Sequence, residues 1–161
     1  MPLPSIALIG ATGAVGRECL SILEQRAFRH GPIKLLASSR SAGSTVPYRG
    51  EQIAVEELGP RSFEGVNLAF FAAGSDTAKS FAPIAVRAGA TVIDKSSAHR
   101  ADANCPLVIP EINPEALAPL RSAPGIAAVP NCSTIILLVP INPLRKAFGI
   151  ERIVVSTYQA A

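Results

Sequence analysis

Three glycines separate the first apolar segment of this chain from its first segment of helical periodicity. Residues 5–9 are rich in β-type side chains and predict a buried strand, and apolar residues recur at helical spacing from Val15 onward. Gly10, Gly13 and Gly16 lie between the two in the spacing G-x-x-G-x-x-G, a variant of the commoner G-x-G-x-x-G. A strand, a glycine turn and a helix in this order indicate a dinucleotide-binding unit, in which N–H groups at the helix start attract phosphate. The alternative is a tight turn that binds nothing.

Strand-like and helical segments continue to alternate along the chain. The residues predict a helix that ends at Gly89, a second that begins after a capping Asn113, a third over residues 133–148, and a loop over residues 38–50. Further strands are predicted at residues 33–37, 53–56, 68–71, 91–94, 107–109, 126–129 and 153–157. This alternation predicts an α/β fold of the Rossmann type, a doubly wound, mostly parallel sheet with helices on both faces, formed by one domain over residues 1–161.

Composition excludes several classes of protein. Hydrophobic residues make up 48% of the 161 residues and charged residues 17%, which is too apolar for a disordered chain. Aromatic residues make up 5% and the basic residues are scattered despite a net charge of +3, so we expect no nucleic-acid partner. The most apolar segment, residues 135–141, is too short to span a membrane, so we expect no membrane association. The 3 cysteines form no C-x-x-C pair, so we expect no metal site, no disulfide framework and a location in the cytoplasm.

The end of the second predicted strand indicates which nicotinamide cofactor the chain prefers. An NAD-binding domain places an Asp or Glu there, against the 2′-hydroxyl of the ribose. This chain has Ser38, Ser39, Arg40 and Ser41 instead, which offer hydroxyl groups and a guanidinium. Such donors suit a 2′-phosphate, so the predicted cofactor is NADP. The alternative is a solvated polar loop.

A cysteine follows the predicted strand at residues 126–129. Cys132 lies within the sequence Pro-Asn-Cys-Ser-Thr at the start of an apolar helix. The unpaired N–H groups of a helix start favour a thiolate, and with the Asn131 side chain they are suited to bind an oxyanion. A thiolate beside a nicotinamide cofactor indicates hydride transfer through a thiohemiacetal and a thioester. The alternative is a buried structural cysteine with Asn131 as a helix cap. Cys19, on an apolar helix face, and Cys105, in a loop, lack this setting.

Five short segments carry a pattern that is specific to one enzyme family. They are GATGAVG at residues 10–16, SRSAG at 39–43, IDKSSAHR at 93–100, PNCST at 130–134 and VSTYQA at 155–160. In sequence and in order these segments resemble the aspartate-semialdehyde dehydrogenases, along nearly the whole chain. The resemblance implies reductive dephosphorylation of β-aspartyl phosphate to aspartate semialdehyde with NADPH, on the route to lysine, threonine and methionine.

The resemblance also implies where the cofactor binds. The residues implied to surround its diphosphate are Gly10, Thr12, Gly13, Ala14, Val15 and Gly16. Arg40 and Ser41 are implied to bind the 2′-phosphate, and Ala73 and Gly74 are implied to pass close to its nicotinamide side.

The implied substrate site surrounds the cysteine. By the resemblance, Cys132 forms the thioester with the substrate, and Arg100 binds the phosphate of β-aspartyl phosphate or inorganic phosphate. Asn131 and Gln159 are implied to orient the substrate.

Three positions depart from the residues usual in this family. Lys95 stands where asparagine is common, His99 where an aromatic residue is common, and Ile136 where a glutamine often follows. Lys95 adds positive charge beside Arg100 and is interpreted as a solvated side chain outside the site. His99 and His30 are interpreted as surface or hydrogen-bonded side chains rather than acid–base groups.

The family's chains extend well beyond a length of 161 residues. The resemblance implies that the general-base histidine, the arginine that binds the substrate carboxylate and much of the dimer interface lie downstream, in a substrate and dimerisation domain of which this chain holds the first residues. We therefore expect a chain with little activity alone, from a full-length parent that is a homodimer or homotetramer. Two alternatives are an N-acetyl-γ-glutamyl-phosphate reductase, whose cysteine usually has a Gly-Cys-Tyr context, and a non-catalytic nucleotide-binding fragment.

Overall fold

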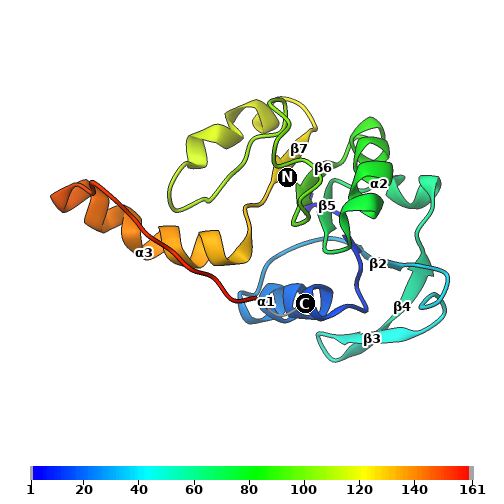
Figure 1. Cartoon of the computed structure of the whole chain (residues 1–161). Coiled ribbons are helices and arrows are strands. Elements are labelled where there is room, and N and C mark those ends of the chain that lie inside the picture. Colours follow the sequence, from blue (N-terminus) through cyan, green and yellow to red (C-terminus); the bar gives the residue numbers. More distant parts are fainter. Residues whose placement is uncertain (1, 160–161) are drawn as a thin grey trace.

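The computed structural model describes residues 2–159 and contains a seven-stranded sheet with the order β3-β4-β2-β1-β5-β6-β7 (Figure 1). Neighbouring strands are parallel except β3 and β4, which are antiparallel, so the predicted mostly parallel, doubly wound sheet is confirmed. The strands are β1 (Ile6–Ile9), β2 (Ile33–Ala37), β3 (Thr45–Tyr48), β4 (Glu51–Glu57), β5 (Leu68–Phe71), β6 (Thr91–Asp94) and β7 (Ile126–Ala128). The helices are α1 (Ala14–Gln25), α2 (Ser75–Arg87) and α3 (Cys132–Phe148), with 3₁₀ helices η1 (Pro60–Phe63) and η2 (Pro114–Arg121).

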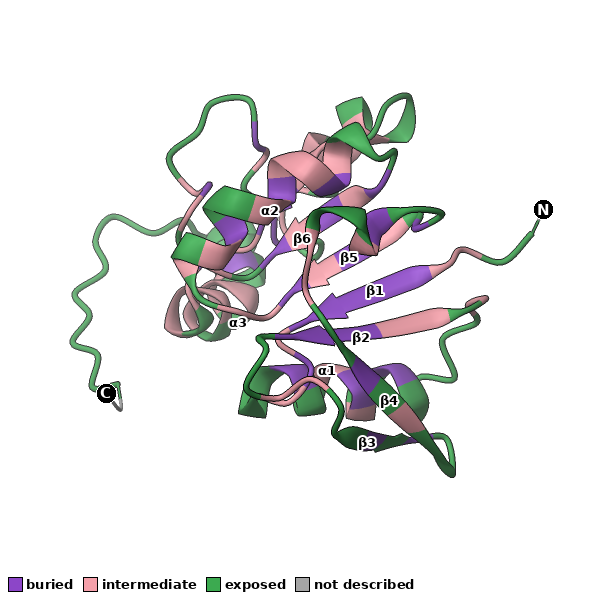
Figure 2. Ribbon diagram, turned by 90° about the vertical axis from the view of Figure 1, so that its right-hand side faces the viewer, coloured by how far each residue is buried: buried purple, intermediate pink, exposed green. Residues whose placement is uncertain are grey.

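Helices cover both faces of the sheet, as the sequence predicts. Figure 2 shows α1 on one side of β1 and β2 and α2 on the other. All residues of β1 are buried, because this strand is central in the sheet and is covered on both faces. Since side chains alternate along a strand, Ile6 and Leu8 join the core beneath α1, whereas Ala7 and Ile9 join the core beneath α2.

Small side chains bring α2 close to the sheet. Ala78, Ala82 and Ala85 recur at helical spacing and are fully buried. Pro83 lies inside the helix, on a turn where its missing N–H removes one intrahelical hydrogen bond. Gly89 follows the helix with φ 95°, as expected for a glycine that ends a helix in the left-handed conformation.

The loops that carry the predicted site residues gather at one edge of the sheet. β2 lies on one side of β1 and β5 on the other, so the direction of winding reverses at β1. In open parallel sheets such a reversal opens a crevice outside the carboxyl ends of the strands. The glycine turn follows β1, residues 72–74 follow β5, and residues 129–132 follow β7, so all three segments reach this edge.

One predicted loop contains a strand. Residues 45–48 were expected within a loop, but they form β3, which pairs with β4 in an antiparallel hairpin. Pro47 suggests a loop because it lacks an N–H group, yet an edge strand tolerates this loss. Arg49 (φ 51°) and Gly50 (φ 79°) are both left-handed, which is the geometry that a two-residue hairpin turn requires.

Two predicted strands are wrong. Residues 107–109 form an isolated bridge between Leu107 and Ala128, not a strand. Residues 153–157 are β-type in sequence, but within the described chain they are exposed and form no strand. β-branched side chains favour a strand where a neighbouring strand offers backbone partners, and the sheet ends at β7 without reaching this segment.

The later helices differ in detail from their predicted form. The segment after Asn113 is the 3₁₀ helix η2, and Asn113 does not cap it with its side chain. Its Oδ1 instead accepts from the Ile109 N–H at 2.9 Å, and its Nδ2 donates to the Leu107 carbonyl at 3.0 Å. α3 is continuous although it contains Pro140 and Pro143, and it projects away from the sheet (Figure 1). Between residues 2 and 159, no helix combines the length and apolarity that crossing a membrane requires.

Candidate active site

Two glycines of the first turn are required by close backbone approach. Gly10 adopts φ 82°, and a Cβ at this position would lie 2.9 Å from the Ala72 carbonyl oxygen. A Cβ at Gly16 would lie 2.2 Å from the Gly10 carbonyl oxygen, closer than any real contact. The start of α1 is therefore packed directly against the turn. A larger residue at Gly16 would push the helix away from the turn.

The start of α1 presents backbone donors without a competing side chain. Gly13 is the N-cap, makes no side-chain cap bond, and is followed by no acidic residue in the first turn. The N–H groups of Ala14, Val15 and Gly16 precede the first intrahelical bond, from Arg17 N to Gly13 O at 3.0 Å. Such groups, together with the helix dipole, form an anion-binding site. The turn therefore fits a diphosphate.

A groove of about 520 Å³ runs from the glycine turn to the loop after β2. It contains most of the predicted cofactor residues, namely Gly10, Thr12, Gly13, Arg40, Ser41 and Ala73. The other four lie beside it: Ala14 and Gly16 form the first turn of α1, Val15 lines a second cavity, and Gly74 is the N-cap of α2.

The groove is also lined by residues from segments that the sequence did not connect to the cofactor, among them Glu57, Leu58, Thr77 and Phe81. Glu57 is the last residue of β4 and pairs with Ala37 at the end of β2. A carboxylate therefore stands near Arg40, although none follows β2 in the sequence. Its place at the carboxyl end of a strand is the sequence feature that could have identified Glu57 as a groove residue. The pairing of β2 with β4 brings it to the groove.

A second cavity of about 480 Å³ joins the glycine turn to the cysteine turn. Its lining residues are Val15, Lys95, Arg100, Val129, Pro130, Asn131, Cys132, Ile135 and Ile136. The start of α1 thus contributes to both hollows, with the N-cap Gly13 in the groove and Val15 of the first turn in the cavity. Cys132 and the predicted phosphate residue Arg100 lie together, at the same sheet edge as the cofactor groove.

Cys132 is the first residue of α3 and is exposed. The alternative of a buried structural cysteine is therefore wrong, although Asn131 does cap the helix. The Asn131 Oδ1 accepts from the Ser133 N–H at 3.0 Å and from the Ser133 hydroxyl at 2.6 Å. The same oxygen lies 3.9 Å from the Cys132 sulfur, so the capping side chain of Asn131 lies beside the thiol.

Gln159 reaches the thiol from the far end of the described chain. The segment after α3 runs back along that helix toward α1 (Figure 1). The Gln159 Oε1 lies 3.4 Å from the Asn131 Nδ2 and 3.9 Å from the Cys132 sulfur, and its Nε2 donates to the Ser133 hydroxyl at 3.2 Å. The structure therefore brings together the cysteine and both amide residues that the resemblance implies.

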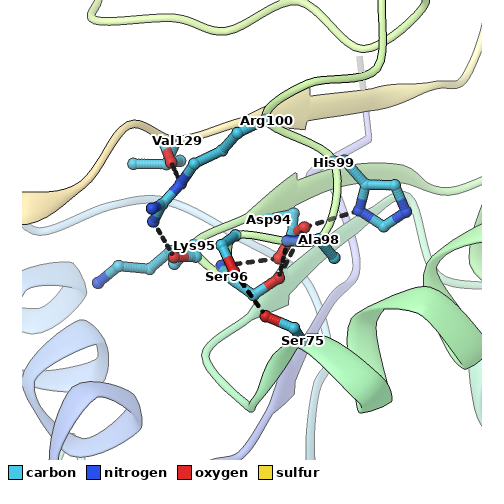
Figure 3. A network of polar contacts seen from close by, with 9 residues as sticks. Ser75, Asp94, Lys95, Ser96, Ala98, His99, Arg100 and Val129 are labelled. Carbon is cyan, nitrogen blue, oxygen red and sulfur yellow. Dashed lines mark hydrogen bonds and ion pairs between the residues drawn. The ribbon is translucent and has the colours of Figure 1, made fainter.

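Arg100 is held by two backbone carbonyl groups (Figure 3). Its Nε donates to the Val129 oxygen at 2.9 Å, and one terminal nitrogen donates to the Lys95 oxygen at 3.1 Å. A guanidinium has five N–H donors, so donors remain for a ligand. Because Val129 belongs to the segment that leads into Cys132, Arg100 is tied to the cysteine turn.

Buried Asp94 organises the loop that carries Arg100. Its Oδ1 accepts from the Ser96 N–H at 2.9 Å, and its Oδ2 accepts from the Ser96 hydroxyl at 3.0 Å and from the His99 Nδ1 at 2.7 Å. His99 is thus a hydrogen-bonded, buried side chain, as the sequence analysis interpreted it. His30 is also bonded, with its Nε2 2.7 Å from the Tyr48 hydroxyl oxygen. Residues 2–159 contain no cluster of His, Cys, Asp and Glu suited to a metal ion.

Burial makes the other two thiols, Cys19 and Cys105, harder to deprotonate. Burial raises the pKa of Cys105 to about 11, and the negative charge of Asp102 adds to the rise. Burial also raises the pKa of Cys19, against the opposing effect of the Lys95 ammonium.

Comparisons with known proteins agree with this geometry. The sequence profile of the family described as "Semialdehyde dehydrogenase, NAD binding domain" matches residues 5–120. An aspartate-semialdehyde dehydrogenase of Bacillus subtilis is 50% identical over 155 residues, which are 96% of this chain and 44% of that protein. The chain thus spans a little under half the length of this relative.

Two solved structures have the same fold over most of the chain. A Vibrio cholerae aspartate semialdehyde dehydrogenase II, described as complexed with ASA, has a TM-score of 0.87 at 44% identity, over 92% of this chain and 48% of that one. A Candida albicans aspartate semialdehyde dehydrogenase with NADP has a TM-score of 0.79 at 28% identity, with the same coverage of 92% and 48%. The profile match extends over the glycine turn, the groove and the Arg100 loop, and on this ground the chain belongs to the semialdehyde dehydrogenase NAD-binding domain family.

Proposed function

We propose that this chain is the NADP-binding part of an aspartate-semialdehyde dehydrogenase and carries the nucleophile of that enzyme. The observation that carries the proposal is the shared cavity, in which exposed Cys132 and Arg100 meet Val15 of the cofactor turn. The names of the Bacillus and Vibrio relatives support aspartate semialdehyde as the substrate, and the NADP in the Candida structure supports the cofactor. The chain would supply the domain over residues 1–161, and the rest of the enzyme would supply the substrate and dimerisation domain.

The cofactor would bind along the groove. The free N–H groups of Ala14, Val15 and Gly16 would hold the diphosphate, and Arg40 and Ser41 would bind the 2′-phosphate. Residues 72–74, at the end of β5, would lie along the nicotinamide side. When bound, the cofactor supplies or accepts the hydride that interconverts the thiohemiacetal and the thioester.

The chemistry would take place at Cys132. Its thiolate adds to the aldehyde carbon, so a carbon–sulfur bond forms and negative charge develops on the oxygen. N–H groups of the first turn of α3 would stabilise that charge, and Asn131 and Gln159 would orient the substrate. Arg100 would hold inorganic phosphate as it attacks the thioester, which releases the thiolate and the acyl phosphate. A general base from outside this chain and a homodimeric or homotetrameric parent are part of the proposal, as is a reducing compartment such as the cytoplasm, because the thiol must stay reduced.

A titration with NADPH and NADH tests the cofactor assignment on this chain. Arg40→Ala should weaken NADPH binding by about 10- to 100-fold, since a hydrogen bond to a charged group is lost, and should leave NADH binding almost unchanged. Arg29→Ala removes a similar charge from an exposed site that does not line the groove, and it serves as the control. Equal losses for both nucleotides, or none, would contradict a 2′-phosphate site at Arg40.

A matched pair of glycine variants tests the diphosphate site. Gly16→Ala should weaken NADPH and NADH binding alike, because the new Cβ pushes α1 away from the turn at a cost of about 1–3 kcal/mol. Gly59→Ala meets no atom within 4 Å and should leave both affinities unchanged.

In a full-length enzyme, Cys132→Ala should abolish turnover, and retained activity would remove Cys132 from the mechanism.

A further inference from the structure

The cavity beside Cys132 contains two cations and no carboxylate. Lys95 and Arg100 are the charged residues among those that line it. Lys95 is exposed, and within residues 2–159 its ammonium forms no ion pair, since the ion pairs there join Arg61 to Glu64 and His99 to Asp94. A lysine in such a position is normally solvated, but here the hollow it faces also holds the thiol.

Partial charges of the backbone add to the positive electrostatic potential that the two cations create in the cavity. The cavity is lined by Val15, in the first turn of α1, and by Cys132, in the first turn of α3. Neither first turn contains an acidic residue. The positive ends of two helix dipoles and two side-chain cations therefore converge on one hollow, which is an environment for an anion with more than one negative charge.

The guanidinium of Arg100 is held against the backbone of Lys95. A terminal nitrogen of Arg100 donates to the carbonyl of Lys95 at 3.1 Å, so both side chains leave the same short loop. In Figure 3 the Lys95 side chain extends away from the Asp94 network toward α1, on the side to which the Arg100 guanidinium also turns. The ammonium is close enough to α1 to oppose the burial that raises the pKa of Cys19.

We propose that Lys95 is a second anion-binding residue of the cavity and that, with Arg100, it binds the phosphate group of the acyl phosphate substrate or inorganic phosphate. The inference rests on the proposed function, because it places that phosphate beside Cys132. It adds a residue that the sequence analysis left outside the site. Arg100 offers a planar fork with a fixed direction, whereas Lys95 offers a compact charge, and a phosphate dianion can bind both at once.

Alkylation of Cys132 by two reagents tests this on the chain itself. Iodoacetate carries a negative charge and iodoacetamide does not, so the ratio of their rates reports the anion affinity of the cavity and cancels changes in thiol reactivity. Lys95→Gln should lower this ratio about three- to tenfold and should weaken the protection that inorganic phosphate gives against iodoacetate by a similar factor. Lys95→Arg should retain most of both effects, and added salt should reduce them. Lys79→Gln, on the exposed surface of α2, makes the same change in net charge and should alter neither.

The outcomes separate this inference from the proposed function. A fall in the ratio and in phosphate protection for both Lys95→Gln and Arg100→Gln supports a two-cation site. A fall for Arg100→Gln with none for Lys95→Gln overturns the role of Lys95 and leaves the proposed function standing. If neither variant changes phosphate protection, both the inference and the phosphate site of the proposed function are wrong. If Lys95→Gln slows both reagents equally, Lys95 acts on the thiol rather than on the anion, and the inference also fails.

Discussion

The three cysteines differ in what surrounds them, and this decides which of them can react. Cys132 is exposed at a helix start, Cys19 is half-buried on α1, and Cys105 is buried beside Asp102. Nucleophilic attack requires a thiolate that a substrate can reach. The residue pattern before Cys132, a strand followed by an asparagine that caps an apolar helix, carried enough information to single it out from the sequence.

Cys105 should show the pH dependence of a buried thiol. Because its pKa is about 11, its alkylation by iodoacetamide should rise about tenfold per pH unit from pH 7 to 9 without a plateau. Peptide mass spectrometry after timed labelling measures this rate for each cysteine separately. The same shift affects stability: the unfolded thiol loses its proton near pH 9 and the folded one near 11, so the free energy of unfolding should fall as pH rises between them. A labelling plateau below pH 9 would contradict the raised pKa.

At the scale of elements, the loop after β6 is held together by hydrogen bonds to its own buried carboxylate. Asp94 is fully buried at the end of that strand, and its carboxylate accepts three hydrogen bonds from within the loop. The loop then presents Lys95 and Arg100 to the cavity. A buried carboxylate is costly to desolvate unless hydrogen bonds satisfy it. Its removal would leave its buried donors without an acceptor, which would destabilise the whole loop.

Removal of this carboxylate should destabilise the chain and weaken anion binding. Asp94→Ala leaves three donors without an acceptor and should lower the free energy of unfolding by about 2–4 kcal/mol. Phosphate protection of Cys132 should fall as well, under conditions where circular dichroism shows the variant to be folded. Asp76→Ala, an exposed acid in the first turn of α2, should cost less than about 1 kcal/mol and leave protection unchanged. Equal stability of the two variants in urea unfolding would refute the organising role of Asp94.

The elements that the sequence predicted well are those whose pattern is local. The strands at residues 33–37, 68–71 and 91–94 have the predicted limits, because each is a short run of mostly β-type residues bounded by residues typical of turns and loops. β3 and the segment at residues 153–157 were wrong in opposite directions, since strand formation there depends on whether a partner is present. In the site, Glu57 was missed for the same reason, because it lies far in sequence from Arg40, with which it lines the groove.

At the scale of the molecule, the chain consists of a well-packed sheet and a helix that stands apart from it. The two cores fill both faces of the sheet, whereas Asn142 is the buried residue of α3. Ile136 is 73% exposed and Phe148 is 83% exposed, although both are apolar. Few buried contacts predict a low free energy for local opening, so α3 should be the least stable of the three α-helices.

Hydrogen exchange should reveal this difference. Amides of β1 and β5 should exchange at the rate of global unfolding, and amides in the second half of α3 should exchange at least about 100-fold faster, because their opening leaves the sheet intact. Exchange measured by mass spectrometry on peptides from each element gives the comparison, with α2 as an internal reference for a helix packed on the sheet. Protection of α3 equal to that of β1 would show that the helix and the sheet unfold together.

The hydrogen bond from Arg100 to the Val129 carbonyl, and that from the Val129 N–H to the Asp94 carbonyl, fasten the segment before Cys132 to the sheet. The sulfur therefore lies at the end of α3 that is held to the sheet, and not on the part of the helix that projects away from it. A tilt of that helix would alter what lies over the cavity while the distance between sulfur and guanidinium stayed nearly constant. The sheet thus sets the alignment of Cys132 with Arg100, whereas α3 contributes Ile135 and Ile136 to the wall of the cavity.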